Sequence, residues 1–315
     1  MFGDPIFLVS LFALFCFIGV WIYQVLHDAL TNQSQQLIYV AGLSSALVGI
    51  YRIFVNAGDL GVVLLIGSII CLIILLIGVT QKNSLLKKTG RGWFFPVFLI
   101  FVLRTFAYEP YQIPSGSMIP GLKVGDFLLV NKHSYGLKIN RIGKPFALAA
   151  DPEYGDVVVF IPPHKNVPYI KRLIGKPGDK INYVNKKLFI NDEALDRVYL
   201  TTEPDTIKKR YKMSSGLIET IEADVITDLF FEKYHSAEYT TRLIRGENEQ
   251  DPQNWIVPDD HYFVMGDNRD DSSDSRKNDF TFVPRENFYG TGELIWMTWE
   301  CWTCLPSFER TGFIQ

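Results

Sequence analysis

The first third of the chain is a succession of apolar runs that carry few charges. Four runs are candidate transmembrane helices: residues 6–26, 37–55, 60–79 and 93–107. The first and third hold no charged residue and are long enough for a helix to cross the ~30 Å hydrocarbon core of a bilayer. The second carries Arg52 near one end, where the side chain can reach the interface, and the fourth is short. The pattern predicts a transmembrane anchor over residues 1–108.

The distribution of basic residues predicts how this anchor is oriented. Residues 80–92 hold four Lys or Arg residues, whereas residues 32–36 and 56–59 hold none. The positive-inside rule therefore predicts that residues 80–92 form a cytoplasmic loop and that everything after Tyr108 lies on the far side. Four spans place the N-terminus outside and three place it inside; small residues such as Gly42 favour four. A cleaved signal peptide is the alternative for the first run, but its flank lacks Lys and Arg.

After Tyr108 the pattern changes to short apolar runs separated by Gly and Pro turns. Six of these runs are predicted strands: residues 127–130, 157–161, 169–174, 187–190, 262–265 and 294–297. No long amphipathic helix interrupts them. The prediction is a mainly β domain over residues 109–190 plus 255–315, with a sandwich or barrel-like core. Residues 191–254 are more polar and less regular, and are interpreted as an inserted cap region.

Composition narrows the possible functions. The chain has 315 residues, enough for about two domains, and its net charge of −3 argues against a basic nucleic-acid binder. Only nine of the 65 charged residues lie in residues 1–108, which excludes a purely soluble protein.

Cys301 and Cys304 form a lone Cys-x-x-Cys pair. A zinc site of the paired type is disfavoured, because it needs a second such pair, so the two cysteines form either a disulfide or two free thiols.

Two segments carry candidate catalytic side chains. Residues 112–118 read Gln-Ile-Pro-Ser-Gly-Ser-Met, and such a turn can direct a serine hydroxyl and backbone N–H groups at one point. An ordinary linker leaving a membrane is the alternative.

On the strand at 169–174, Lys171 is flanked on its own face by apolar neighbours, so burial would lower its pKa and make it a base. The alternative is a lysine with its head group in water.

A third segment, residues 265–276, is dense in charges and hydroxyls. It does not fit a calcium loop, because Arg269 stands where a ligand is needed and no Gly follows at the sixth position. It is either a solvated loop or a set of groups that orient a catalytic amine. None of the five histidines lies in a motif, so a serine nucleophile would need another base, and lysine is the best remaining choice.

Together these segments resemble the bacterial type I signal peptidases, or leader peptidases. The resemblance rests on the 112–118 segment, Gly-Asp-Phe at 125–127, Gly-Asp-Val-Val-Val-Phe at 155–160, Tyr-Ile-Lys-Arg at 169–172 and Gly-Asp-Asn-Arg-Asp at 266–270. It implies a Ser/Lys dyad of Ser117 and Lys171, with Ser115 and Ser117 forming the oxyanion hole. It also implies that Ser272 bonds the lysine amine and that Asp274 and Arg276 hold that loop.

The same resemblance implies the residues that contact substrate. They would line small pockets for the residue before the cut (Ile113, Met118, Leu122 and Tyr169) and for the residue two positions further back (Tyr111, Leu128, Val159 and Ile170).

The resemblance implies a membrane-bound serine endopeptidase that cleaves signal peptides from exported preproteins after Ala-x-Ala-like sites, without metal or other cofactor. It implies a multi-pass protein of the bacterial inner membrane, with its catalytic domain on the periplasmic side and the export machinery as a possible partner. A related Ser-Lys protease with a narrow substrate is the second reading. A membrane-tethered peptide binder is the third, and it is disfavoured because both serine and lysine are present.

Overall fold

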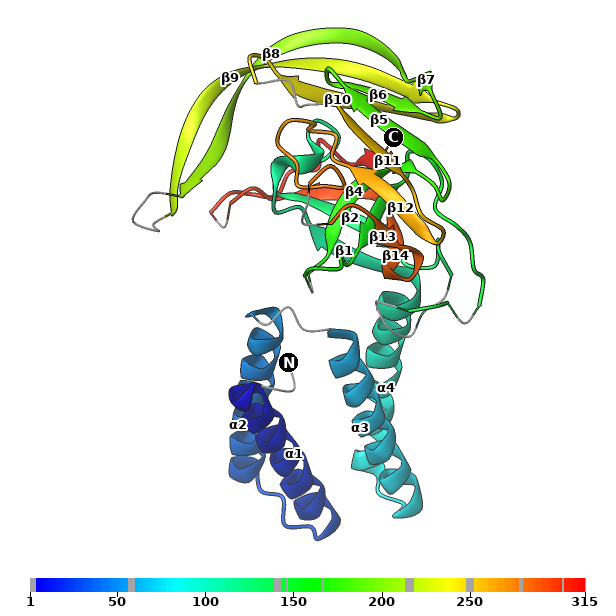
Figure 1. The fold of residues 1–315 in the computed structure, drawn as a ribbon. Helices are drawn as coiled ribbons and strands as arrows, with labels where there is room; N and C mark the ends of the chain where they lie inside the picture. The colour runs from blue at the N-terminus through cyan, green and yellow to red at the C-terminus, as the bar shows by residue number, and fades with distance from the viewer. Residues whose placement is uncertain are drawn as a thin grey trace. The chain divides into compact units, whose positions relative to one another are not determined.

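The computed structural model describes residues 4–55, 60–136, 138, 143–145, 147–165, 167–212, 218–247, 252–277, 280–301 and 303–314. The chain divides into two compact units, residues 1–105 and 106–315. The first is helical and the second is built of strands (Figure 1). Each unit has its own hydrophobic core.

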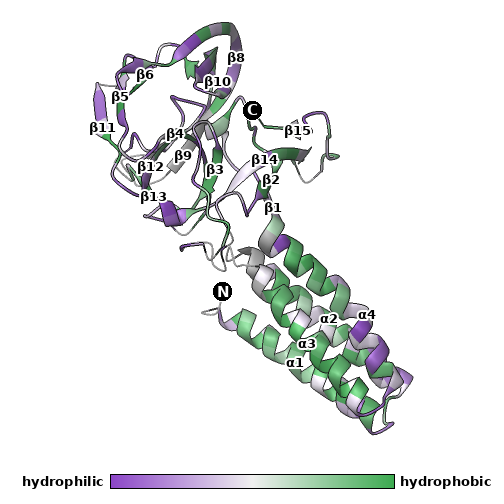
Figure 2. Cartoon of the chain, turned by 90° about the vertical axis from the view of Figure 1, so that its right-hand side faces the viewer, coloured by the Kyte–Doolittle hydropathy of each residue, from purple (hydrophilic) through white to green (hydrophobic). Residues whose placement is uncertain are grey.

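Each of the four predicted apolar runs forms a helix in the first unit. The helices are α1 (Pro5–Leu26), α2 (Asn32–Val55), α3 (Leu60–Thr80) and α4 (Ser84–Val102). Their residues are mostly hydrophobic, as the green colour in Figure 2 shows. Among the described residues, two helices are long and apolar enough to cross a bilayer, Pro5–Leu26 and Val63–Thr80. Arg52 of α2 forms an ion pair with Asp4, 2.7 Å away, which also caps the N-terminus of α1.

The predicted loop at 80–92 is wrong in its extent, because helix α4 already begins at Ser84. The cause is a helix cap: the side chain of Asn83 accepts hydrogen bonds from the backbone N–H groups of Leu85 and Leu86, both at 3.1 Å. Close packing of α3 against α4 also favours this helix. A Cβ atom on Gly90 would lie 2.5 Å from the backbone nitrogen of Leu75, so only glycine permits the approach.

The second unit contains an eight-stranded antiparallel sheet that carries the candidate catalytic residues. Its strand order is β1-β2-β14-β3-β4-β12-β13, with β15 paired to β14. The strands are β1 (Tyr108–Gln112), β2 (Asp126–Asn131), β3 (Val157–Phe160), β4 (Tyr169–Gly175), β12 (His261–Met265), β13 (Val283–Pro284), β14 (Phe288–Thr298) and β15 (Gly312–Phe313). The predicted mainly β fold of this part of the chain is therefore confirmed.

A smaller four-stranded sheet, ordered β11-β5-β6-β7, shares a hydrophobic core with strands of the eight-stranded sheet and of the insertion. It consists of β5 (Lys180–Val184), β6 (Lys187–Ile190), β7 (Glu193–Ala194) and β11 (Gln253–Ile256). All six strands predicted from apolar runs are present in one of these two sheets. Their burial explains the prediction: in β3 every side chain is buried, so the strand is apolar throughout.

The description of residues 191–254 as less regular is wrong. Most of this insertion is a three-stranded antiparallel sheet of β8 (Asp196–Lys212), β9 (Ile218–Tyr234) and β10 (Ala237–Ile244), in the order β10-β9-β8. Figure 1 shows β8 and β9 as a long curved hairpin. Polar side chains and Pro204 hid the strands in the sequence. Pro204 is tolerated because β8 is an edge strand, whose outer side needs no hydrogen-bond donor.

Candidate active site

The candidate nucleophile Ser117 lies on a short 3₁₀ turn, Gly116–Met118, that follows strand β1. Three residues before this turn, Ile113 still pairs with β2, since its N–H donates to the carbonyl of Asp126 at 2.8 Å. The chain then leaves the sheet and presents the half-buried Ser117. Ser115 caps the turn in extended conformation, is exposed, and makes no capping hydrogen bond with its side chain.

Lys171 extends from strand β4 to this turn. Its side chain is only 4% exposed, and its Nζ lies 2.5 Å from Ser117 Oγ, within hydrogen-bond distance. Burial lowers the pKa of Lys171 to about 8, against the carboxylates of Asp274 and Asp267, which raise it. The structure thus brings together the serine and the lysine that the sequence analysis singled out.

Asp274 and Arg276 form a buried, two-pronged ion pair. Arg276 donates from Nε to Asp274 Oδ1 at 2.9 Å and from Nη2 to Asp274 Oδ2 at 2.8 Å. Burial alone would raise the pKa of Asp274, but Arg276 and the N–H of Gly266 bring it down to about 2. The expected pairing of these two residues is present, and it fixes the loop that faces Lys171.

Ser272 lies in the same loop but does not bond the lysine amine as expected. Its Oγ is buried and has no partner at hydrogen-bond geometry within the described part of the chain. The hydroxyl nevertheless contributes to the lowered pKa of Asp274. The Ser272 side chain lies beside Gly266 and the carbonyl oxygen of Ser117.

Seven of the eight residues expected to contact substrate gather in one apolar cluster. They are Tyr111, Ile113, Met118, Leu122, Leu128, Val159 and Ile170. The eighth, Tyr169, is separate: it packs with Phe160 and Phe280, and its ring centroid lies 5.9 Å from Lys171 Nζ. The difference follows from strand periodicity, since Tyr169 and Ile170 point to opposite faces of β4.

Sequence reasoning missed three residues that hold the site together. Arg172 forms a fully buried two-pronged ion pair with Asp267, at 2.8 and 2.7 Å. Gly266 lets this loop approach the nucleophile: an added Cβ would collide with Ser272 Oγ and lie 2.5 Å from the carbonyl oxygen of Ser117. The sequence held a signal for these residues, because Arg172 directly follows the candidate base Lys171, and Asp267 directly follows Gly266 in the charged segment 265–276.

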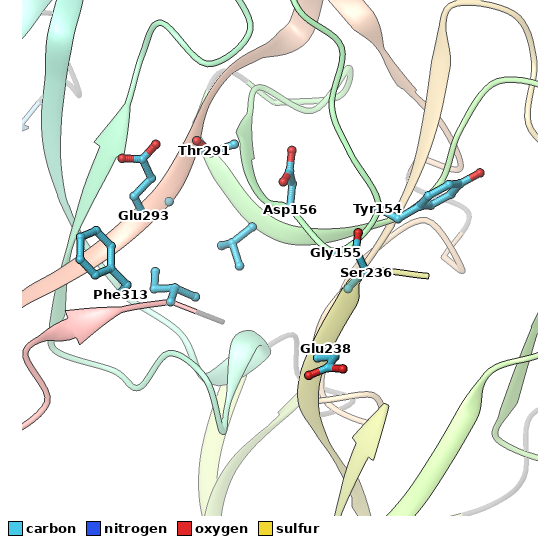
Figure 3. Close-up of a pocket in the computed structure, with 12 residues that line it drawn as sticks. Tyr154, Gly155, Asp156, Ser236, Glu238, Thr291, Glu293 and Phe313 are labelled. Carbon is cyan, nitrogen blue, oxygen red and sulfur yellow. The ribbon is translucent and has the colours of Figure 1, made fainter. Parts of the chain in front are cut away.

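A cavity of about 550 Å³ lies elsewhere in the second unit (Figure 3). Its lining includes the carboxylates of Asp156, Glu238 and Glu293 but neither Ser117 nor Lys171. The Ser117–Lys171 pair, by contrast, meets the geometric requirement for a nucleophile and its base, because a base must lie within hydrogen-bond reach of the proton it removes.

Two further features bear on possible cofactors. Within the described ranges, no group of three His, Cys, Asp or Glu side chains is placed to hold a metal ion. Cys301 and Cys304 form a disulfide, which decides between the two alternatives left open by the sequence.

Comparison with known proteins identifies the family of the chain. The family model described as signal peptidase, peptidase S26, matches residues 86–299. Signal peptidase I of Pseudomonas fluorescens is 40% identical over 248 residues, which cover 75% of this chain and 81% of the relative. That of Pseudomonas aeruginosa is 38% identical with the same coverage. A crystal structure of signal peptidase I from Enterococcus faecalis is 27% identical and covers 45% of this chain and 97% of its own, with a TM-score of 0.25.

The family match extends over most of the second unit and includes the segments that carry Ser117, Lys171 and Asp274. The apolar helices of the first unit fit association with a membrane. The chain belongs to the signal peptidase family, peptidase S26, and is a hydrolase that cleaves signal peptides.

Proposed function

We propose that this chain cleaves signal peptides by acyl transfer, with Ser117 as nucleophile and Lys171 as general base. The main support for this proposal is the 2.5 Å distance between Lys171 Nζ and Ser117 Oγ in a buried site. A pKa of about 8 leaves part of the lysine neutral near physiological pH, and the neutral amine can accept the serine proton.

The steps balance without any cofactor. Lys171 takes the proton as Ser117 Oγ attacks the scissile carbonyl, and the same proton passes to the leaving amine of the mature protein. Water, activated by the neutral lysine, then hydrolyses the ester and frees the signal peptide. The backbone N–H of Ser117 and the hydroxyl of Ser115 would bind the oxyanion, and such donors typically contribute about 3–4 kcal/mol each.

The loop behind the lysine would set its direction. Asp274 and Arg276 neutralise each other and hold this loop, while Ser272 is buried beside the carbonyl oxygen of Ser117. Since Ser272 Oγ has no partner at hydrogen-bond geometry among the described residues, a rotation of its side chain would let it bond Lys171 when the substrate is bound. We assign these three residues to positioning.

The apolar cluster beside Ser117 supports specificity for small residues. Ile113, Met118 and Leu122 lie in a tightly packed core, and an Ala side chain before the cut fits there better than a large one. Tyr169 lies on the opposite face of β4, with its ring centroid 5.9 Å from Lys171 Nζ, so we place it beside the lysine and outside this cluster. The remaining members would bind the residue two positions further back: Tyr111, Leu128, Val159 and Ile170. Ala-x-Ala-like cleavage sites follow, because rejection of larger side chains is mainly steric.

We also propose a multi-pass topology in an inner membrane, with the catalytic unit on the periplasmic side. The support is the cluster of basic residues at the start of α4, which the positive-inside rule assigns to the cytoplasm. Exported preproteins would reach the site through the export machinery. Single cysteines placed at Gln81 and at Ser307, in a chain whose own cysteines are replaced, test this with a membrane-impermeant thiol reagent. Only the second should be labelled in intact spheroplasts.

Cleavage of a purified preprotein in detergent tests the mechanism. We expect Ser117→Ala and Lys171→Arg to be inactive, because arginine keeps the charge but cannot become a neutral base. Lys138→Arg is the matched control: burial also lowers the pKa of Lys138 to about 8, but this lysine bonds the carbonyls of Glu286 and Phe288. A fully active Lys171→Arg enzyme would overturn the proposed base.

The second candidate is a related Ser-Lys protease with one regulatory substrate, since it would keep the same dyad. The relatives named signal peptidase I favour the broad enzyme. Cleavage of a set of unrelated preproteins separates the two: the broad enzyme processes most of them, and the narrow one processes none or one.

A further inference from the structure

We infer that Asn268 is a positioning residue of the oxyanion hole, which aims the backbone N–H of Ser117 at the developing negative charge. This inference rests on the proposed function of Ser117. It concerns a residue that lies 151 positions away from Ser117 along the chain.

The contacts of Asn268 converge on the nucleophile turn. Its side-chain Nδ2 donates to the carbonyl oxygen of Gly116 at 3.0 Å, and its backbone N–H donates to the carbonyl oxygen of Ser117 at 3.1 Å. The two carbonyls flank the nucleophile on either side. Asn268 itself is fully buried, so these bonds are shielded from water.

Planarity of the peptide bond turns the first contact into control over the oxyanion hole. The carbonyl of Gly116 and the N–H of Ser117 belong to one peptide unit, which is trans and therefore points them in opposite directions. A donor that holds the Gly116 oxygen on one side fixes where the Ser117 N–H points on the other. It also polarises the unit, which strengthens the N–H as a donor.

The side chain of Asn268 also shows a feature that stability alone does not explain. Its Oδ1 is buried and has no hydrogen-bond partner among the residues that the structure describes. A buried acceptor without a partner destabilises the folded state, and an apolar residue of the same shape would avoid this. The amide is therefore best explained by its donor, which bonds Gly116.

Neighbouring residues keep Asn268 from moving. The main chain at Asn268 bridges to Arg242 of β10, and the adjacent Arg269 N–H donates to the Arg242 carbonyl at 3.0 Å. On the other side, Asp267 is held by Arg172. The main chain at Asn268 is thus fixed to the three-stranded sheet through Arg242 and to the eight-stranded sheet through Asp267 and Arg172. The turn that carries Ser117 is in turn fixed to the side chain of Asn268.

The test is Asn268→Leu, which removes the donor and the unpartnered acceptor while keeping the side-chain volume. We expect kcat to fall by about tenfold to a hundredfold. This loss is no larger than that caused by removing a group that donates directly to the oxyanion. KM should stay within about twofold. The melting temperature should change little, because the variant removes the unpartnered Oδ1 and the Gly116 carbonyl still accepts from the N–H of Ile119 at 3.2 Å. Asn268→Ser serves if the leucine variant does not fold.

A peptide aldehyde separates positioning from a merely structural role. It forms a tetrahedral adduct with Ser117, so its inhibition constant should weaken by the same factor as kcat. Binding of the parent peptide, measured in the Ser117→Ala background, should not change. If both ligands weaken equally, Asn268 shapes the substrate groove instead and the inference is wrong. Native kcat in both Asn268 variants would overturn it as well.

Asn287→Leu is the matched control. Asn287 is also buried, and its Nδ2 donates to a backbone carbonyl, that of Ile161, at 2.7 Å. We expect this variant to lose stability and keep its kcat. Failure of the proposed function would give a different result: the native chain would not cleave signal peptides, or Ser117→Ala would stay active. If only this inference fails, cleavage still depends on Ser117 but kcat does not change when Asn268 is replaced.

Discussion

Lys171 and Asp274 lie close enough in the buried site for the Asp274 carboxylate to raise the pKa of the lysine, against the larger lowering effect of burial. Arg276 holds that carboxylate by two hydrogen bonds and offsets part of its effect. The balance places the lysine pKa at about 8, and it makes the pH dependence of cleavage a direct test of the site.

Cleavage should increase with pH as Lys171 loses its proton. The neutral fraction is half at a pKa of about 8, so kcat/KM should fall about tenfold per pH unit below pH 7 and level off above pH 9. Initial rates on a signal-peptide substrate between pH 6 and pH 10 measure this. Lys138→Arg should give the same midpoint as the native chain, and a flat profile from pH 6 to pH 9 would contradict Lys171 as the base.

Replacing Lys171 by Met should stabilise the fold near neutral pH. The folded-state pKa is about 8, below the ordinary 10.5, so below pH 8 the folded chain must keep a charged amine in a buried site. This penalty fades as pH rises from about 8 to about 10.5. We expect the free energy of unfolding of Lys171→Met to exceed the native value by about 3 kcal/mol at pH 7. The two values should converge above pH 10.5, and equal stabilities at pH 7 would contradict the burial effect.

Asp274→Asn should change both stability and the pH profile. It leaves the buried Arg276 without its counter-charge, which typically costs about 3–5 kcal/mol. It also removes a negative charge that raises the lysine pKa, so the midpoint of any residual activity should move below pH 8. Thermal unfolding and the rate profile measure these effects. Asp192→Asn, in the exposed Lys180–Asp192 pair, is the control and should change neither.

The dyad could be predicted from sequence because each half lies in a compact local motif. Ser117 follows a Pro-Ser-Gly turn, and Lys171 is flanked by apolar residues on one face of a strand. The role of Asn268 could not be predicted in the same way. Its partners are carbonyl groups of Gly116 and Ser117, and no side-chain pattern records which carbonyl a buried amide bonds after the chain folds.

Two parts of the fold also escaped the sequence reading, for different reasons. Helix α4 begins earlier than its apolar run because Asn83 caps it, so basic residues such as Lys87 lie on a helix rather than in a loop. The β8–β9 hairpin lacks a simple alternation of apolar and polar residues. Its strands are held by backbone pairing over long sequence separations, such as Asp196 with Lys233, which only the folded chain reveals.

Gly266→Ala should inactivate the enzyme while leaving most of the fold intact. The new methyl group would lie 2.5 Å from the Ser117 carbonyl oxygen, so the nucleophile turn or the loop must shift. Because a misplacement of about 1 Å can cost a hundredfold in rate, we expect at least that loss in kcat. Gly312→Ala is the control, since an added Cβ there meets no atom within 4 Å. Native activity of Gly266→Ala would show that the loop does not support Ser117.

The inserted hairpin should contribute to catalysis through one ion pair. Glu232 of β9 and Arg269 of the catalytic loop are both 2% exposed and are joined by two hydrogen bonds. Glu232→Gln leaves Arg269 buried without its full counter-charge, so we expect about 3 kcal/mol lower stability and a lower kcat, because the loop that carries Asn268 is displaced.

Glu238→Gln breaks the neighbouring Lys233–Glu238 pair, whose side chains are both 49% exposed. That change should cost less than 1 kcal/mol and no activity, because exposed pairs contribute about 0–1 kcal/mol. Chemical denaturation and kcat, measured side by side, compare the two variants. If Glu232→Gln loses stability but keeps its kcat, the hairpin supports the fold alone and the catalytic loop is positioned without it.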